Sequence, residues 1–253
     1  MPAQSPGNLA PKTAPKHRLY MHPLCSPDAK VRVNKLLCIY IYRMRLLELL
    51  SGTKSVGKVA EGLGFEVTSL DNKNADINTN ILNWDYTIYE PKHFDVVWAS
   101  PPCTEYSRAL TTRTRNISSA NEIVMKTLEI IEHLNPTYFI LENPQTGLLK
   151  EQPFMYGIPY KDIDYCKYGM PYRKGTRLWN NLFSWTPKEL CNKDCGNTTD
   201  NKHNATAQRM PNGTKDTWGN KPLFKQDDLY VVPELLINEI LTNLTSHETD
   251  ILT

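Results

Sequence analysis

From residue 45 onward, apolar and polar positions follow two alternating patterns. Short apolar runs typical of buried strands lie at 45–50, 65–70, 94–99 and 138–141. Segments whose apolar residues recur at helical spacing lie at 56–63, 121–134 and 233–244. Strands that alternate with helices predict an α/β fold with a mostly parallel, doubly wound sheet.

The regularity of the pattern also divides the chain. Residues 1–43 begin with a proline-rich stretch without periodicity, and we expect an N-terminal extension that is partly disordered. Residues 44–185 and 223–253 carry the regular pattern and form the expected main domain. Residues 186–222 are rich in Asn, Lys, Asp and Gly, and we expect a short loop-rich insert there.

Composition narrows the class of protein. The formal net charge is only +2, so any binding to nucleic acid needs a local basic patch. The six cysteines show no regular framework, which favours a reduced, intracellular environment. The apolar run 36–42 is too short to span a bilayer, and no signal peptide opens the sequence. We expect a soluble intracellular protein that does not bind membranes.

The turn after the first predicted strand has the features of a ligand site. Gly52 allows a tight turn into the helix that follows, whose N-terminus then faces the ligand. Asp71 ends the next predicted strand about 20 residues later, which is the offset at which a carboxylate binds ribose hydroxyls. Many α/β proteins contain such a pair, so these two residues alone do not define the ligand.

Cys103 is the strongest candidate for chemistry. It follows Ser100-Pro101-Pro102 directly after the buried run 94–99. Ligands of open parallel sheets bind beyond the carboxyl ends of the strands, and the two prolines stiffen the turn that would present the thiol there. A buried structural cysteine is the alternative, but the polar residues that follow Cys103 favour a functional one.

Glu142 occupies an equivalent position, because Glu142-Asn143-Pro144 follows the apolar run 138–141. Asn-Pro is also a common turn dipeptide, so a purely structural role is the alternative. A carboxylate at this strand end would share the sheet edge with Cys103.

Four motifs in this order resemble one family. Leu47-Glu-Leu-Leu-Ser-Gly-Thr53, Pro101-Pro-Cys103, Glu142-Asn-Pro144 and Tyr168-Gly-Met-Pro-Tyr-Arg-Lys-Gly-Thr-Arg177 together look like the cytosine carbon-5 DNA methyltransferases, particularly small phage- and virus-type members. The resemblance covers roughly residues 45–245. It implies a Rossmann-like fold that binds S-adenosylmethionine, and methyl transfer to carbon 5 of a cytosine flipped out of double-stranded DNA.

The resemblance also implies roles for individual residues. Cys103 would add to cytosine carbon 6, as a thiolate can, and Glu142 would hydrogen-bond and protonate ring N3. An arginine of the last motif would help to hold the base, with Arg177 the first choice and Arg173 the second. The expected cofactor-binding residues are Leu50, Gly52, Thr53, Ser55, Val56, Asp71, Asn72, Asp76, Ile77 and Pro101. The expected contacts to DNA phosphates are Arg108, Arg113 and Arg115, although a solvated surface loop is an equal alternative. We expect a monomer.

Two departures from the family pattern keep other functions open. Leu50 and Lys54 stand where the family usually has Phe and Gly, so a catalytically silent module that binds cofactor or DNA is one alternative. An exocyclic amino-methyltransferase is the other, because Ser-Pro-Pro also marks that class.

The insert 186–222 is a candidate DNA-recognition segment that also carries possible metal ligands. Cys191, Cys195 and His203 could be three zinc ligands, but a fourth is missing unless Cys166 folds back. The favoured interpretation of the sequence is therefore two free cysteines and no metal.

Overall fold

The computed structural model describes residues 43–207 and 226–251, and the described residues from Met44 onward form one compact unit. The described residues include only Arg43 of the expected N-terminal extension. They also leave out residues 208–222 of the expected insert. The proposed boundary at residue 44 therefore stays a prediction.

A seven-stranded sheet organises the described residues, in the order β3-β2-β1-β4-β5-β7-β6. Its strands are β1 (Arg45–Leu49), β2 (Glu66–Asp71), β3 (Ile77–Asn78), β4 (Val96–Ala99), β5 (Tyr138–Pro144), β6 (Tyr160–Asp164) and β7 (Gly175–Asn180). The strands from β3 to β5 pair in parallel, whereas β7 runs antiparallel to both β5 and β6. The predicted α/β fold with a mostly parallel, doubly wound sheet is confirmed.

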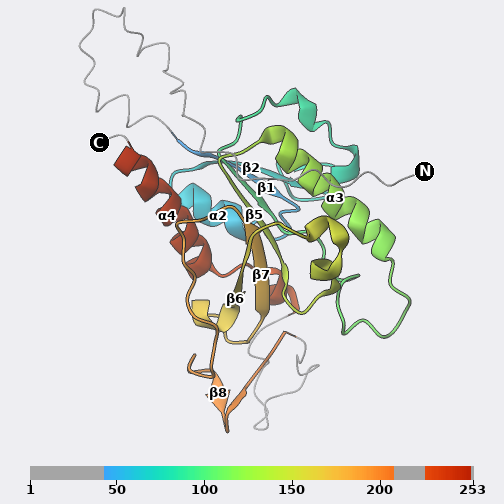
Figure 1. Ribbon diagram of the computed structural model, residues 1–253, viewed down its shortest axis with the longest axis vertical. Coiled ribbons are helices and arrows are strands. Elements are labelled where there is room, and N and C mark those ends of the chain that lie inside the picture. Colours follow the sequence, from blue (N-terminus) through green and yellow to red (C-terminus); the bar gives the residue numbers. More distant parts are fainter. Residues whose placement is uncertain (1–42, 208–225, 252–253) are drawn as a thin grey trace, which may run out of the picture. The chain divides into compact units, whose positions relative to one another are not determined.

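Both faces of the sheet are buried, which explains why the central strands scarcely alternate in sequence. In β1, Leu46 packs in a core with α2 (Ser55–Gly62) and α4 (Glu234–Ile251), while the next residue, Leu47, packs on the opposite face with α3 (Ile117–Leu134). Figure 1 shows α2 and α4 together on one side of the sheet and α3 on the other.

The predicted helices are all present, and two of them are longer than expected: α4 ends at Ile251 rather than at residue 244, and α3 starts earlier. Helix α3 begins one turn before the predicted residue 121, because the Asn116 side chain accepts a hydrogen bond from Ser119 N at 3.1 Å and caps the helix there. Short 3-10 helices join the main elements at Ile81–Asn83, Tyr86–Ile88, Leu148–Glu151, Pro153–Met155, Tyr165–Tyr168 and Gln226–Tyr230.

Two antiparallel pairs were not predicted from the sequence. Strands β6 and β7 complete the sheet, with Asp162 opposite Arg177 and Asp164 opposite Gly175. Within the insert, β8 (Thr198–Thr199) and β9 (Lys202–His203) form a small hairpin. The described part of the insert is thus more ordered than its composition indicated.

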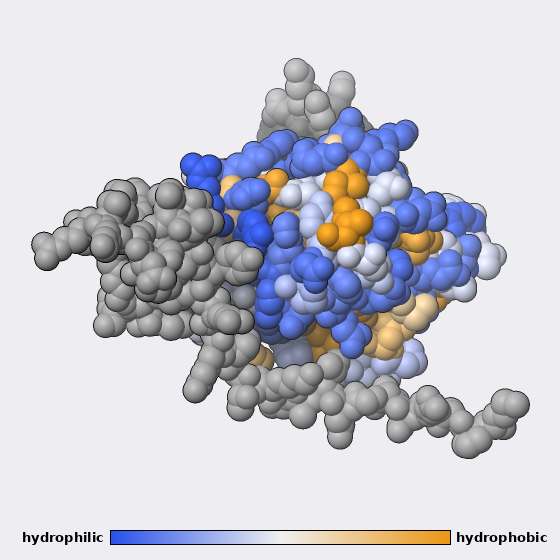
Figure 2. Space-filling view, turned by 90° about the horizontal axis from the view of Figure 1, so that it is seen from above, coloured by the Kyte–Doolittle hydropathy of each residue, from blue (hydrophilic) through white to orange (hydrophobic). Residues whose placement is uncertain are grey.

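The surface is mainly polar on the face shown in Figure 2, where hydrophobic residues are exposed only in small separate areas. Among residues 43–207 and 226–251, no helix is both long enough and apolar enough to cross a membrane.

Candidate active site

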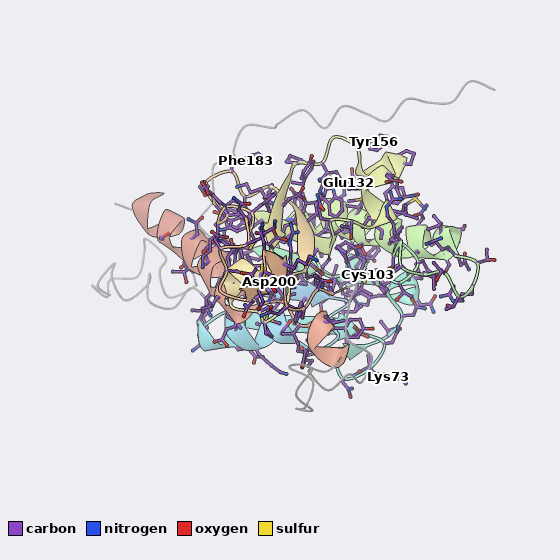
Figure 3. The ribbon with its side chains drawn as sticks, turned by 90° about the horizontal axis from the view of Figure 1, so that it is seen from below. Lys73, Cys103, Glu132, Tyr156, Phe183 and Asp200 are labelled. Atoms are coloured by element: carbon purple, nitrogen blue, oxygen red, sulfur yellow. The ribbon has the colours of Figure 1, made fainter. Side chains whose placement is uncertain are left out.

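Cys103 lies in the loop that leaves β4, at the carboxyl end of the parallel strands. The loop is fixed to the neighbouring strand, because Asn143 Nδ2 donates a buried hydrogen bond to the Pro101 carbonyl oxygen at 2.9 Å. Tyr106 N donates to the Cys103 carbonyl oxygen at 3.1 Å and closes a turn after the cysteine. In Figure 3, Cys103 lies near the middle of the view, whereas Lys73 lies at the periphery.

Glu142, on β5, is buried between two other polar side chains. Tyr165 Oη donates a hydrogen bond to Glu142 Oε1 at 3.0 Å, and Lys174 Nζ lies 3.4 Å from the same oxygen. Lys174 is itself buried, donates to the Leu229 carbonyl oxygen at 3.1 Å, and lies over the Tyr165 ring at 4.8 Å from its centroid. The sequence did not identify Lys174 or Tyr165.

The charges of Lys174 and Glu142 both affect the pKa of the Cys103 thiol. Burial raises the pKa of Cys103 above its usual value, the positive charge of Lys174 acts to lower it, and the negative charge of Glu142 acts to raise it. Cys103, Glu142 and Lys174 therefore form one electrostatically coupled group. A partly exposed thiol whose pKa is raised needs a nearby cation to form the nucleophilic thiolate near neutral pH.

The structure does not bring Arg173 or Arg177 to this group. Arg177 makes two hydrogen bonds to Asp162, at 2.7 and 2.8 Å, and stacks over the Tyr160 ring. Arg173 makes two to Asp164, at 2.9 and 3.2 Å. Their predicted role in holding the base stays a prediction, and the cation beside Glu142 is Lys174.

The alternation of the strand explains this difference. Glu142 lies opposite Leu178 in the β5–β7 pair, while Arg177 lies opposite Asn143. Because successive residues of a strand point to opposite faces, Arg177 points away from the face that carries Glu142. Lys174, which precedes β7 directly, has the same parity as Leu178 and reaches Glu142.

The turn after β1 joins three predicted cofactor residues. Gly52 N donates to Asp71 Oδ2 at 2.9 Å, and Asn72 N donates to Asp71 Oδ1 at 2.6 Å, so the turn and the end of β2 are held together. Leu50 and Lys54 adopt left-handed backbone conformations, with φ of 57° and 54°. Both non-glycine residues carry local strain in the turn.

Two hydroxyl oxygens beside this turn, Ser51 Oγ and Thr53 Oγ1, are buried and have no hydrogen-bond partner. Unsatisfied buried hydroxyls are costly and call for an explanation, and a polar ligand in the turn supplies one. With the carboxylate of Asp71 at the next strand end, the donor set fits a ribose-containing cofactor.

The other predicted cofactor residues have structural partners. Ser55 Oγ accepts a hydrogen bond from Val232 N, the Val56 side chain is buried in the core, and Asp76 holds both Ser69 and Lys54. Ile77 belongs to the short strand β3. The structure thus places Leu50, Gly52, Thr53, Asp71, Asn72 and Pro101 at the strand ends, while the side chains of Ser55, Val56 and Asp76 contact other parts of the fold.

Glu48 is a buried carboxylate beneath the same turn that the sequence analysis missed. It accepts hydrogen bonds from Val56 N at 3.3 Å and Gly57 N at 3.0 Å, at the N-terminus of α2. Desolvation by burial raises the pKa of Glu48 to about 7, against the lowering effect of these two bonds. A Cβ on Gly57 would lie 2.7 Å from Glu48 Oε2, so only glycine permits this approach.

The three arginines expected to contact DNA are engaged within the protein. Arg108 and Arg113 form ion pairs with Glu151 and Glu105, and the pair with Arg113 is the main cause that lowers the pKa of Glu105 to about 2. Arg115 donates to the carbonyl oxygens of Ser107 and Arg108. Contact of these arginines with phosphate stays a prediction, and it requires exchange of exposed ion pairs.

Comparison with known proteins agrees with the site. Residues 66–153 match the C-5 cytosine-specific DNA methylase family. A probable DNA (cytosine-5)-methyltransferase of Frog virus 3 (isolate Goorha) is 39% identical over 169 residues, which cover 60% of this chain and 77% of the viral protein. The chain belongs to the cytosine carbon-5 DNA methylase family.

Solved structures with a similar fold share little sequence with this chain. A putative DNA modification methyltransferase from an E. coli prophage is 17% identical with a TM-score of 0.41, and the match covers 58% of this chain and 52% of that one. An Entamoeba histolytica methyltransferase is also 17% identical, with a TM-score of 0.45 and coverage of 59% and 56%. The chain spans about half the length of these solved structures.

Proposed function

We propose that this protein methylates carbon 5 of cytosine in double-stranded DNA, with Cys103 as the nucleophile. The observation that carries the proposal is the arrangement of three groups at one edge of the sheet: Cys103 after β4, Glu142 on β5 and Lys174 directly before β7, with Lys174 Nζ 3.4 Å from Glu142 Oε1 and its positive charge acting on Cys103. A nucleophile, an acid and a cation are the groups that this reaction needs.

Each group has a defined task in the addition step. The Cys103 thiolate forms a bond to carbon 6 of cytosine. The electron pair of the 5,6 double bond shifts to the 4,5 bond, and the pair of the 3,4 double bond moves onto N3, which takes a proton from Glu142. Lys174 and the Tyr165 hydroxyl then stabilise the carboxylate that Glu142 becomes. Before addition, the charge of Lys174 favours the thiolate.

The cofactor that the family implies is S-adenosylmethionine. Asp71 would bind its ribose hydroxyls, and Ser51 and Thr53 would supply the hydroxyl groups that are otherwise unsatisfied in the turn. When bound, the cofactor would supply an electrophilic methyl group for carbon 5 of the base.

The cytosine must leave the base stack to reach Cys103, because this partly exposed thiol lies in a loop at the edge of the sheet. Flipping a base costs a few kcal/mol, which contacts to the phosphates would offset. Arg108 and Arg113, with side chains that are more than half exposed, are placed to exchange their carboxylate partners for phosphates.

The test is to trap the covalent adduct. Duplex DNA that contains 5-fluorocytosine should form a stable complex with the protein in the presence of S-adenosylmethionine, because fluorine cannot leave as a proton does. Digestion of ordinary DNA after the reaction should give 5-methylcytosine. Cys103→Ser should abolish both results, since serine forms no accessible anion near neutral pH, and Cys25→Ser, in the expected N-terminal extension, should leave both unchanged.

Adduct formation that persists in Cys103→Ser would overturn the assignment of the nucleophile. The catalytically silent alternative is supported by the strained turn at Leu50 and Lys54. Calorimetry separates the two functions: a wild-type protein that binds no S-adenosylmethionine, and a Lys54→Gly protein that does, would establish the silent alternative.

A further inference from the structure

Four side chains outside the active site converge where the described part of the insert meets the main domain. Cys166, Cys191, Cys195 and His203 place their sulfur and nitrogen atoms within 4.8 Å of one another. His203 Nε2 lies 3.3 Å from Cys191 Sγ and 3.7 Å from Cys166 Sγ. All three cysteines are free thiols.

These separations match a tetrahedral zinc site. Zinc bonds of about 2.3 Å to sulfur and about 2.0 Å to nitrogen place neighbouring ligand atoms about 3.5–3.8 Å apart. We propose that the four residues bind one zinc ion as a Cys3His site. Four protein ligands leave no open coordination position, so the ion has a structural role.

The local backbone presents the ligands in a way typical of such sites. Cys191 and Cys195 flank a tight loop in which Lys193 has a left-handed φ angle of 66° and Asn192 N donates to Asp194 Oδ1 at 3.2 Å, and Gly196, directly after Cys195, has a φ of 78°. His203 follows a hairpin turn whose two central residues, Asp200 and Asn201, are also left-handed, as a two-residue turn of type I′ requires.

A fourth ligand from the main domain completes the set. Cys166 belongs to the 3-10 helix Tyr165–Tyr168, directly after the tyrosine that contacts Glu142. It is buried, with 4% of its surface exposed. The ion would therefore connect the insert to the segment that forms one wall of the active site.

Charged neighbours support bound thiolates. Asp164 accepts a hydrogen bond from Cys191 N at 3.0 Å and pairs with Arg173, so this carboxylate orients a ligand residue from outside the coordination sphere. Arg173 and Lys167 both interact electrostatically with Cys166 and Cys191, and they would offset the negative charge that three thiolates give to the complex.

The same region connects to Lys174. Arg173 N donates to the Ala205 carbonyl oxygen at 3.0 Å, and Ala207 N donates to the Arg173 carbonyl oxygen at 2.9 Å. The residue after Arg173 is the lysine that contacts Glu142. A zinc ion in this position would fix the start of the candidate recognition segment against the backbone that positions Lys174.

The proposal is tested on the full chain by metal content, independently of methyl transfer. Protein expressed with zinc in the medium should contain about one zinc ion per chain by elemental analysis. Replacement by cobalt should give the absorption bands of tetrahedral thiolate coordination. Removal by a strong chelator should lower the melting temperature, because a structural ion binds only the folded state.

Variants locate the ion. Cys195→Ala should lose the metal, and its partly exposed position makes a folding defect small. His203→Ala should also lose it, whereas His203→Cys should retain it, because four cysteines bind zinc equally well. Cys103→Ala removes a thiol outside the cluster and should keep about one ion per chain, even though this variant is inactive under the proposed function.

Metal-free protein that melts at the same temperature with and without zinc would overturn the proposal. A mass lower by two hydrogen atoms in non-reducing conditions, which marks a disulfide within the cluster, would do the same. Failure of the methyltransferase assay leaves these readouts unaffected, so the two proposals fail separately.

Discussion

The parallel half of the sheet and its antiparallel edge supply the active site in different ways. In the parallel half, Gly52, Asp71 and Cys103 follow or end a strand, and Glu142 lies near the carboxyl end of β5, so the topology brings all four to one edge. At the antiparallel edge, a residue reaches the site only if its side chain points to the same face as Glu142. This depends on its position along β7 or in the loop that precedes β7. Lys174 reaches Glu142, and Arg177, three residues later, does not.

The difference concerns how tolerant each half is to change. An active-site residue at the end of a parallel strand keeps its position when the sequence of the following loop varies, because the strand fixes where that loop begins. A residue on an antiparallel strand changes face when the register moves by one. The cation of the site therefore occupies the position that is most sensitive to local sequence.

The largest expected effect is on the rate of methyl transfer when Lys174, at the antiparallel edge, is replaced. Lys174→Met should lower the rate of methyl transfer about a thousandfold, because it removes the charge that stabilises both the Cys103 thiolate and the ionised Glu142. Its pH-rate profile should also move to higher pH, since Cys103 then deprotonates only in more alkaline solution. Lys174→Arg should restore much of the rate.

Arg177→Met is the matched control for that experiment. It should lower the melting temperature by breaking the pair with Asp162, with less than about a tenfold effect on the rate. If Lys174→Met lowered the rate only slightly and Arg177→Met were inactive, the assignment of Lys174 as the cation of the active site would be wrong. That role would then belong to Arg177, as the resemblance implies.

In the parallel half, the next prediction concerns Glu48, a buried carboxylate beneath the turn after β1, and its effect on the free energy of unfolding. Its pKa rises from 4.5 to about 7 on folding, so the unfolded chain loses this proton first as the pH increases. Stability from this group is fully present below about pH 4.5 and is lost as the pH rises to about 7, by about 3 kcal/mol at most. Glu48→Gln should remove this dependence.

Chemical denaturation of both proteins from pH 4.5 to 8 measures that effect. The free energy of unfolding of the wild type, relative to Glu48→Gln, should fall across this window. A difference that stays constant, or that rises with pH, would mean that the carboxylate is ionised throughout.

The smallest effect concerns Asp71 at the end of β2. Asp71→Ala should weaken S-adenosylmethionine binding by about 1–3 kcal/mol, because it removes charge-assisted hydrogen bonds to the ribose and frees Gly52 N. Isothermal calorimetry measures the loss. Asp85→Ala, which removes an exposed carboxylate that caps a short 3-10 helix, should bind the cofactor as the wild type does. Equal affinities for Asp71→Ala and the wild type would place the cofactor elsewhere.

The sequence predicted the parallel half because its signals are local. Apolar runs such as 94–99 and 138–141 are continuous, and each ends at the motif that carries chemistry. Strand β6 has the sequence YKDID, with only one aliphatic residue, so no apolar run marked it. Without β6 and β7 the parity of Arg177 and Lys174 could not be derived, and the resemblance alone favoured the arginines.

The cysteine cluster could be predicted only in part, because only some of its residues are close in sequence. Cys191, Cys195 and His203 are close in sequence and were identified as possible ligands. The fourth, Cys166, comes from a different part of the chain, and only the fold brings it to the others. Similarly, Glu48 is an acidic residue within an apolar strand, and its contact with the N-terminus of α2 depends on tertiary packing at Gly57.

The hydrogen bond from Asn143 to the Pro101 carbonyl has a kinetic consequence. It joins the loop of Cys103 to the strand of Glu142, so the nucleophile and the acid move as one unit. Preorganised groups lose little entropy when the base arrives, and this advantage appears in the activation entropy of the reaction. Loosening this link in Asn143→Ala would leave both reacting side chains intact, yet their relative position would vary, and the rate would fall mainly through a less favourable activation entropy.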